Sequence, residues 1–259
     1  MEIKINYLES VQKNISDVYE AIKKLKMKKK GLLKAIQDTQ ANLESYTPKV
    51  KVKKIVREKE WYEKFHWTII ENFLVIGGKD AQTNEILVRK YFEDSDLFFH
   101  ADIHGASVVI LKNGLNAPES VLNKTAQFAA CFSSAWKMGI PISVYCVRKD
   151  QVKLAAKPGE YLPKGSFVLL GERKWFKNME LLLGVCFLDE KLAVLPELEI
   201  RDKDFPYILI KPDPSVTKKE IVDKLYTSLQ KLYPGKVFEK SWLLEILPSG
   251  GADIVKIKP

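Results

Sequence analysis

The sequence is short of the residues that build disulfide frameworks and zinc sites. It contains three cysteines, Cys131, Cys146 and Cys186, and three histidines among 259 residues. An odd number of cysteines with no C-x-x-C pair predicts neither a disulfide scaffold nor a zinc ribbon. Unpaired thiols are typical of a reducing compartment, so we expect a cytoplasmic protein.

Long apolar runs and nucleotide-binding motifs are also missing. No apolar stretch approaches the ~20 residues that span a bilayer, and the N-terminus lacks the apolar core of a secretory signal, so no membrane partner is expected. The chain has no P-loop, no dinucleotide-binding glycine fingerprint and no nucleophile elbow. Motifs therefore give enzymatic chemistry little support, and we expect no cofactor.

The chain does have an uneven excess of positive charge. Its formal net charge is +9, and residues 1–60 hold 15 Lys or Arg against 8 Asp or Glu, a net of +7. A content of 46% hydrophobic residues is ordinary for a folded globular chain. The basic excess favours phosphate-rich partners.

Apolar residues in the first part of the chain repeat at alternating steps of three and four. The repeat predicts a coiled-coil helix over residues 1–46, ended by Pro48. Because Lys29 occupies a position of the seam and Gly31 costs about 1 kcal/mol in a helix, the helix needs a partner, either a second copy or a separate chain. The seam residues are Leu8, Val11, Ile15, Val18, Ile22, Leu25, Leu32 and Ile36.

Six lysines cluster between residues 23 and 30 of this helix. They are either the solvated face of a coiled coil or a phosphate-binding surface. Residues 47–60, with the run PKVKVKK, indicate a basic linker. The following WYEKFHW, residues 61–67, favours the anchor of a new core over a role in stacking on bases.

The remaining sequence predicts an α+β fold. For residues 61–188 we expect a mixed β-sheet domain, with strands at FLVIGG, DLFFHA, SVVILKN, PISVYCV and SFVLL and one covering helix from Pro118 to Gly139. Residues 189–259 predict a small C-terminal β-α extension, with a strand over 207–212 and a helix over 217–232.

The stretch FFHADIHGAS, residues 98–107, places His100, Asp102 and His104 inside an expected strand. Residues two apart on a strand share a face, so the three side chains would project together. Two imidazoles and a carboxylate can hold a metal or do acid-base work. The alternatives are a polar cluster that holds the turn at Gly105, and a cluster that also faces a ligand such as a nucleotide.

Five stretches in order resemble the RNA-binding domain of the NFACT family, which includes NEMF, Caliban and the bacterial proteins labelled fibronectin-binding protein A. They are WYEKFHW, LVIGGKDAQTNEILVRKY, FFHADIHGAS, TAQFAACFSSAWK and GEYLPKGSF, within residues 55–188. The lysine-rich coiled coil also fits the family, and the β-α tail with its LPSGG turn resembles its archaeal-type members. VKLAAKP and GERK differ from the family's usual runs.

The resemblance implies a component of ribosome-associated quality control. Family members bind the large ribosomal subunit carrying a stalled peptidyl-tRNA and recruit tRNA to extend the stalled chain, as adaptors without a catalytic centre. The family's NFACT-N and helix-hairpin-helix parts are absent here, so we expect a C-terminal piece or a split chain whose partner carries them. Partners implied are rRNA of the large subunit and tRNA.

We expect one RNA-facing surface formed by the signature stretch and nearby cations. DNA is a further candidate ligand, since phosphate contacts do not report the sugar. Two other functions stay open: a metal-dependent hydrolase or nuclease built on the histidine cluster, and a coiled-coil scaffold. The expected surface comprises Lys79, Asp80, Asn84, Arg89, His100, Asp102, His104, Lys112, Lys153, Lys157, Lys164, Arg173 and Lys174.

Overall fold

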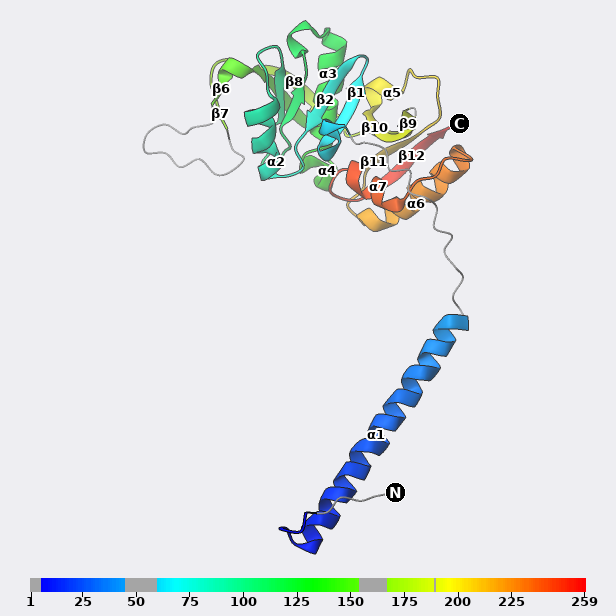
Figure 1. The fold of residues 1–259 in the computed structure, drawn as a ribbon. Helices are drawn as coiled ribbons and strands as arrows, with labels where there is room; N and C mark the ends of the chain where they lie inside the picture. The colour runs from blue at the N-terminus through cyan, green and yellow to red at the C-terminus, as the bar shows by residue number, and fades with distance from the viewer. Residues whose placement is uncertain (1–5, 45–59, 154–166, 189) are drawn as a thin grey trace. The chain divides into compact units, whose positions relative to one another are not determined.

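The computed structural model describes residues 6–44, 60–153, 167–188 and 190–259. The chain forms two compact units, Met1–Glu58 and Lys59–Pro259 (Figure 1). In the described parts, no helix combines the length and the apolar character needed to cross a membrane. The basic linker expected over 47–60 lies almost wholly outside the described residues.

The first unit contains one long helix, α1 (Val11–Glu44), as the heptad pattern predicts. Ser10 marks its start, because Ser10 Oγ accepts a hydrogen bond from the Lys13 amide at 3.3 Å. The Asn14 side chain also reaches back to the Asn6 backbone, at 2.7 and 2.9 Å. Leu8 therefore lies in a turn before the helix, so its expected place in the helical seam is wrong.

The seam of α1 is uncovered within the described part of its unit. Its exposed side chains range from 43% exposed at Ile22 to 75% at Val11, and Val18 is half-buried. Nothing lies within 4 Å of a Cβ added to Gly31. A helix with an apolar stripe gains most of its stability from packing that stripe. The coiled-coil pairing of this seam stays a prediction.

The second unit is built on two antiparallel sheets, which confirms the α+β class. The larger sheet has the order β1-β2-β4-β3-β5-β8. Its strands are β1 (His66–Ile70), β2 (Phe73–Gly77), β3 (Leu97–Ala101), β4 (Val109–Leu111), β5 (Ile142–Arg148) and β8 (Lys174–Met179). A separate pair, β6 (Val152–Lys153) with β7 (Val168–Leu169), flanks it.

All strand pairs among the described residues are antiparallel, where we expected a mixed sheet. DLFFHA and SVVILKN form the pair β3–β4 rather than one bent strand. A tight turn at Glu71 joins β1 to β2. Such a turn can join only antiparallel strands, because a parallel pair needs a crossover of a dozen or more residues.

Helices cover the larger sheet on both faces (Figure 1). On one face lies α3 (Glu119–Cys131), the covering helix that the sequence predicts. On the other lie α2 (Ala81–Ile86) and the π-helical turn η2 (Leu87–Tyr91), which the sequence analysis missed. Leu87 and Val88 of η2 pack there against Ile76, Phe98 and Ile110. Three short helical turns complete this part: η1 (Trp61–Lys64) precedes β1, η3 (Gly114–Asn116) lies between β4 and α3, and η4 (Lys149–Gln151) joins β5 to β6.

The second sheet has the order β10-β9-β11-β12. Helix α6 (Lys218–Leu232) begins at a capping box, in which Thr217 and Glu220 hydrogen-bond each other's backbone amides. The strand expected over 207–212 and the helix expected over 217–232 are both present. The elements are β9 (Leu183–Leu188), β10 (Lys191–Pro196), α5 (Glu197–Ile200), β11 (Tyr207–Pro212), α6, α7 (Lys240–Ile246) and β12 (Ala252–Lys258).

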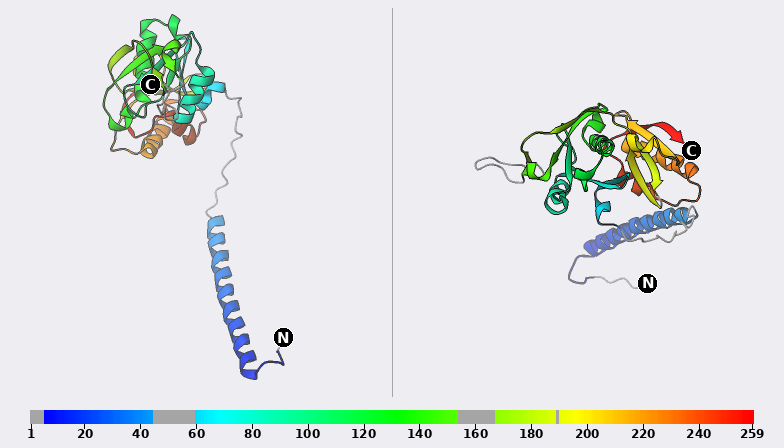
Figure 2. Two further views of the ribbon diagram at one scale, coloured as in Figure 1. Left: turned by 90° about the vertical axis from the view of Figure 1, so that its left-hand side faces the viewer. Right: turned by 90° about the horizontal axis from the view of Figure 1, so that it is seen from above.

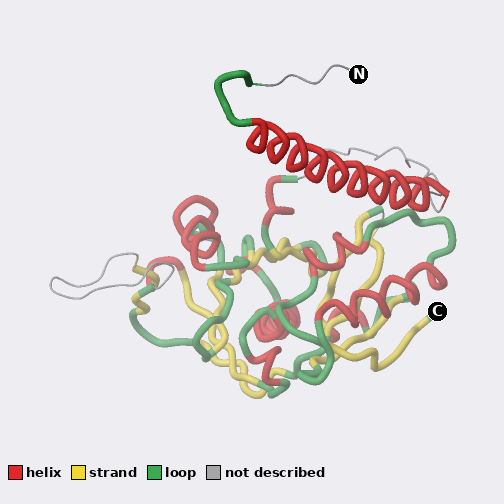
Figure 3. The backbone as a smooth tube through the Cα atoms, turned by 90° about the horizontal axis from the view of Figure 1, so that it is seen from below, coloured by secondary structure: helices red, strands yellow, loops and turns green. Residues whose placement is uncertain are grey.

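Helix α3 lies between the two sheets and is buried almost all round. Nine of its 13 residues are buried, and it contacts β3, β5 and β8 of the larger sheet as well as β10 and α5. In the view from below it is seen nearly end-on, among strands on either side (Figure 3). Phe128 shares one apolar core with Phe99 of the larger sheet and Ile208 of the second.

The boundary expected at residue 188 falls between β9 and β10, which pair along their whole length. β9 also pairs with β11, so the strand before residue 188 belongs to the same sheet as the strands after it. The views from the side and from above show the yellow and red elements of this sheet packed against the green ones (Figure 2). Residues 61–188 and 189–259 therefore share a core in the structure.

The covering helix does not run unbroken to Gly139 as we expected. It ends at Cys131, and a short helix α4 (Ala135–Met138) follows, with Gly139 at its C-terminus in the left-handed region. The Ser133 hydroxyl donates to the Ala130 carbonyl at 2.7 Å, and the Phe132 carbonyl accepts from the Ser107 amide at 3.2 Å. These bonds replace helical ones and turn the chain.

A buried carboxylate links the two sheets and α3. Glu199 of α5 is 3% exposed, and its oxygens lie 2.7 Å from Lys124 Nζ of α3 and 2.7 Å from Lys203 Nζ. Lys124 also contacts Glu71 of the β1–β2 turn at 3.0 Å. Burial alone would raise the pKa of Glu199, but the two lysines outweigh it and hold the pKa below its usual value.

Replacing Glu199 with glutamine should destabilise the protein by about 2–3 kcal/mol at neutral pH, because it leaves Lys124 partly buried with one carboxylate fewer. Since the pKa of Glu199 is lowered on folding, its contribution is present above the unfolded pKa and is lost as the pH falls through the folded one. Urea unfolding at pH 7 and at acidic pH measures both. The exposed Glu180→Gln is the control and should change stability by less than ~0.5 kcal/mol; equal effects would contradict the assignment.

Candidate nucleic-acid interface

Three aromatic side chains form a row across one face of the larger sheet. His100 of β3 lies opposite Tyr145 of β5, which lies opposite Trp175 of β8. The ring centres are 5.7 Å apart for His100 and Tyr145, and 5.3 Å for Tyr145 and Trp175. Directly opposite residues on neighbouring strands share a face. We call His100, Tyr145 and Trp175 the aromatic row.

Two cations flank the row, Arg173 immediately before β8 and Lys177 within it. The Arg173 guanidinium lies 4.7 Å from the centre of the Tyr145 ring, within the range of a cation–π contact. Lys177 follows Trp175 by two residues and so projects from the same face. Both cations are exposed. The intervening Lys174 projects from the other face, where it pairs with Glu119.

His100 contributes a neutral imidazole to the row. Burial lowers its pKa and outweighs the raising effects of backbone hydrogen bonds and of the Asp102 charge. The Arg173 charge adds a small further lowering. Its Nδ1 lies 3.2 Å from the Tyr145 hydroxyl. At neutral pH the ring is therefore a hydrogen-bonding and stacking group rather than a third cation.

His100, Asp102 and His104 do not share a strand face, contrary to the sequence-based expectation. β3 ends at Ala101, and residues 102–105 form a turn in which the Ile103 amide donates to the Ala101 carbonyl at 2.8 Å. The His104 carbonyl accepts from the Ser134 hydroxyl at 2.6 Å. The side chains of Asp102 and His104 are exposed. Among the described residues, no three His, Cys, Asp or Glu are placed to hold a metal ion.

Two expected RNA-facing residues instead have their side chains bound into the fold. Lys112 is 15% exposed and lies 2.6 Å from Asp96, whose side chain is fully buried, and 3.1 Å from Glu93. Asn84 is buried, and its Oδ1 accepts a hydrogen bond from the Val108 amide at 3.0 Å. We therefore remove Lys112 and Asn84 from the candidate surface, because neither presents its polar group outward.

The other expected residues lie apart from the row or outside the described residues. Asp80 caps α2 by accepting from the Thr83 amide at 2.8 Å, and Arg89 pairs with Glu85 at 2.8 Å. Lys153 is exposed on β6. Lys157 and Lys164 lie outside the described residues.

A second basic cluster surrounds His66 at the start of β1. Burial, helped by the charges of Lys79 and Lys218, lowers the pKa of His66 to about 3. The His66 ring packs 4.2 Å from the Phe132 ring, between centres. Lys218, at the start of α6, donates to the Leu247 carbonyl at 3.0 Å. Lys79, an expected RNA contact, thus lies near a lysine that the sequence analysis did not associate with it.

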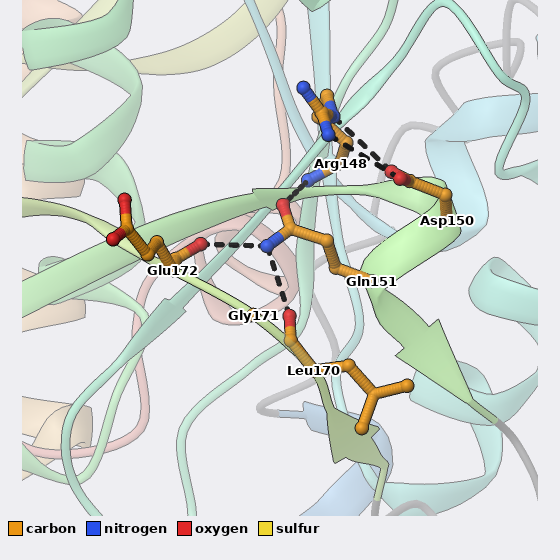
Figure 4. A pocket seen from close by; sticks show the side chains of 6 residues that line it. All are labelled: Arg148, Asp150, Gln151, Leu170, Gly171 and Glu172. Carbon is orange, nitrogen blue, oxygen red and sulfur yellow. Dashed lines mark hydrogen bonds and ion pairs between the residues drawn. The ribbon is translucent and has the colours of Figure 1, made fainter.

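A shallow hollow of about 450 Å³ lies where β5 passes into the β6–β7 pair (Figure 4). Its polar groups are engaged with one another. The Gln151 side-chain Nε2 donates to the backbone carbonyls of Leu170 and Glu172 at 2.9 and 2.7 Å. Its Oε1 accepts from the backbone amide of Arg148 at 2.9 Å. Glu172 directly precedes Arg173. The Gln151 side chain therefore fixes the backbone just before β8, next to Arg173.

The sequence analysis missed three residues of this face: Tyr145, Trp175 and Lys177. A signal for two of them was present, because Arg173, Trp175 and Lys177 alternate with Lys174 and Phe176, as on a strand with two distinct faces. Tyr145 could not be linked to His100 without the register of β3 and β5.

Comparison with known proteins matches residues 64–171 to the family model described as "NFACT protein RNA binding domain". The chain is 40% identical over 210 residues to the "Archaeal Rqc2 homolog aRqcH" of Methanocaldococcus jannaschii, covering 79% of this chain and 31% of that protein. It is 36% identical over 183 residues to the human "Ribosome quality control complex subunit NEMF", covering 70% and 16%.

Among solved structures, the C-terminal part of the fibronectin/fibrinogen-binding protein of Streptococcus suis overlaps with a TM-score of 0.39 and 17% identity. The overlap covers 67% of this chain and 78% of that one. The chain spans less than a third of the length of the two curated relatives.

Lys112→Ala should destabilise the protein by about 3 kcal/mol, because it leaves the buried Asp96 carboxylate without its lysine. The affinity of the folded variant for RNA should equal that of the wild type. Urea unfolding measures the first quantity, and RNA binding at a temperature where the variant is folded measures the second. A loss of RNA affinity without a loss of stability would return Lys112 to the candidate surface.

Proposed function

Because the chain belongs to the NFACT family, we propose that it is an RNA-binding component of ribosome-associated quality control. In this proposal it contacts the large ribosomal subunit, tRNA or both, on complexes that carry a stalled peptidyl-tRNA. The observation that carries the proposal is the match of residues 64–171 to the NFACT RNA-binding domain. That range includes β1 to β5 and two members of the aromatic row, His100 and Tyr145.

The charge of the open sheet face supports RNA as the ligand. Arg173 just before β8 and Lys177 on β8 are exposed, and each can neutralise a phosphate. The formal charge of +9 favours encounter with any polyanion. The name of the human relative, "Ribosome quality control complex subunit NEMF", supports ribosomal RNA over DNA as the ligand.

We propose an adaptor rather than an enzyme. The row offers a stacking ring at Trp175 and a hydrogen-bonding ring at His100, and the adjacent Arg173 and Lys177 supply positive charge; these properties serve recognition. A role at ribosomes implies that the chain works in the cytoplasm, with any NFACT-N and helix-hairpin-helix parts supplied by the same longer protein or by a partner chain.

The purified chain should co-sediment with large ribosomal subunits, and more strongly with subunits that carry peptidyl-tRNA than with vacant ones. The Arg173→Gln, Lys177→Gln double variant should bind more weakly, and the slope of log K against log salt should fall by about 0.7–0.9 for each lost phosphate contact. Sedimentation at low and moderate salt measures both.

The matched control removes two charges from the second sheet and α6, as Lys231→Gln with Lys256→Gln. It should bind nearly as well as the wild type. Absence of binding to both kinds of subunit, at every salt concentration, would contradict the proposal.

The uncovered seam of α1 favours a second, compatible role in assembly. We propose that this seam pairs with the α1 helix of another copy of the chain. The exposed Val11, Ile15, Ile22 and Leu25 follow the three-and-four spacing that two-stranded coiled coils bury.

The Ile15→Asp, Ile22→Asp double variant should not self-associate, because pairing would bury two charges in the seam of each helix. Sedimentation velocity over a range of chain concentrations measures the mass. Met27→Asp is the matched control, since Met27 is exposed but lies off the seam, and it should associate like the wild type. A wild-type chain that stays monomeric at high concentration would refute self-pairing.

A further inference from the structure

Trp175 holds an unusual position for a tryptophan. It is 42% exposed on β8, an edge strand of the larger sheet. Its contact with Tyr145 has an interplanar angle of 67°, which is an edge contact and not a parallel stack. Among the described residues, no ring lies parallel to the indole. An exposed flat ring on a rigid sheet is a surface on which a planar partner can stack.

The charges beside Trp175 indicate what that partner is. Arg173 immediately precedes β8 and Lys177 lies within it, so the two cations stand on either side of Trp175 along the chain. Neither has a carboxylate partner among the described residues, whereas Lys174 on the opposite face pairs with Glu119. A planar surface between two exposed cations matches a base with a phosphate on each side.

The far end of the row has a different character. There the neutral imidazole of His100 lies near the exposed carboxylate of Asp102. A carboxylate repels phosphate but accepts hydrogen bonds from the N–H groups of bases. The phosphates are therefore expected at β8, and the edge of a base toward β3.

We propose that Trp175, the exposed end of the aromatic row, is a platform for an unpaired nucleotide of RNA, with the base stacked on its ring and the flanking phosphates at Arg173 and Lys177. Tyr145 is 7% exposed and supports the indole by its edge contact. This inference rests on the proposed RNA-binding function and specifies its ligand as a single-stranded segment. The bases of an A-form duplex are stacked on one another and cannot reach a flat sheet face. The edge of β8 is also a poor docking strand for a peptide, because exposed lysines on an edge disfavour strand pairing.

The test measures the affinity of the full chain for a fluorescently labelled single-stranded 12-mer RNA of mixed sequence, and for a hairpin of the same composition, by anisotropy. Trp175→Ala should weaken binding of the single strand by about 5- to 100-fold, the range expected for the loss of one stacked base. Trp175→Phe should retain most of the affinity. Binding of the hairpin should change little in either variant.

Salt dependence separates stacking from charge. Trp175→Ala should leave the salt slope of single-strand binding unchanged, whereas Arg173→Gln and Lys177→Gln should each lower it by about 0.7. Trp242→Ala is the matched control, because Trp242 on α7 is 40% exposed and lies on the second sheet's side of the unit. It should bind like the wild type.

Trp175→Leu keeps an apolar side chain against Tyr145 and guards against loss of the fold. Suppose that Trp175→Ala and Trp175→Leu both have the stability of the wild type and bind the single-stranded RNA as tightly as it does. The stacking platform is then refuted, while the proposed RNA binding stands. An equal loss for Trp175→Phe and Trp175→Ala would also refute stacking. If the wild type binds neither RNA at any salt concentration, the proposed function itself fails.

Discussion

The structure of the second unit depends on the burial of α3 between two sheets. Phe128 and its neighbours on α3 complete one apolar core with residues of both sheets. A surface helix would need one apolar stripe, but α3 is covered on several sides, and small residues such as Ala126, Ala129 and Ala130 let the strands approach it closely. The ion pairs of Glu199, Lys124 and Glu71 join the same three layers at their rim.

This arrangement decides which part of the larger sheet is open. α3 occupies one face, while α2 and η2 occupy the other face over β2, β4 and β3. Trp175 and the two cations lie at the β8 end of that second face, whereas Tyr145 is buried in the core that α2 and η2 share with the sheet. A rigid, antiparallel sheet holds these side chains at fixed spacing, which a loop would not do without ordering cost. The candidate interface is thus centred on the β8 edge of the sheet, where Trp175 is exposed.

Several elements could be predicted because their causes are local. The heptad repeat of α1, the capping box of α6 and the short apolar run of FLVIGG act over a few residues, and the structure has these elements. The predictions that were wrong concern features set by residues far apart in the sequence. The Ser107 amide ends α3 by bonding Phe132, and the pairing of β9 with β11 joins parts that composition had separated at residue 188.

The same division holds for the candidate site. The sequence by itself determined the family, through ordered motifs, and it predicted that His100, Asp102 and Arg173 belong to one RNA-facing surface. Only the tertiary structure decided that Lys112 neutralises a buried aspartate, that Asn84 satisfies a buried amide, and that Tyr145 and Trp175 continue the line from His100. The physical reason is that charge and ring type are properties of single residues. Burial and register are properties of pairs that the chain brings together from far apart.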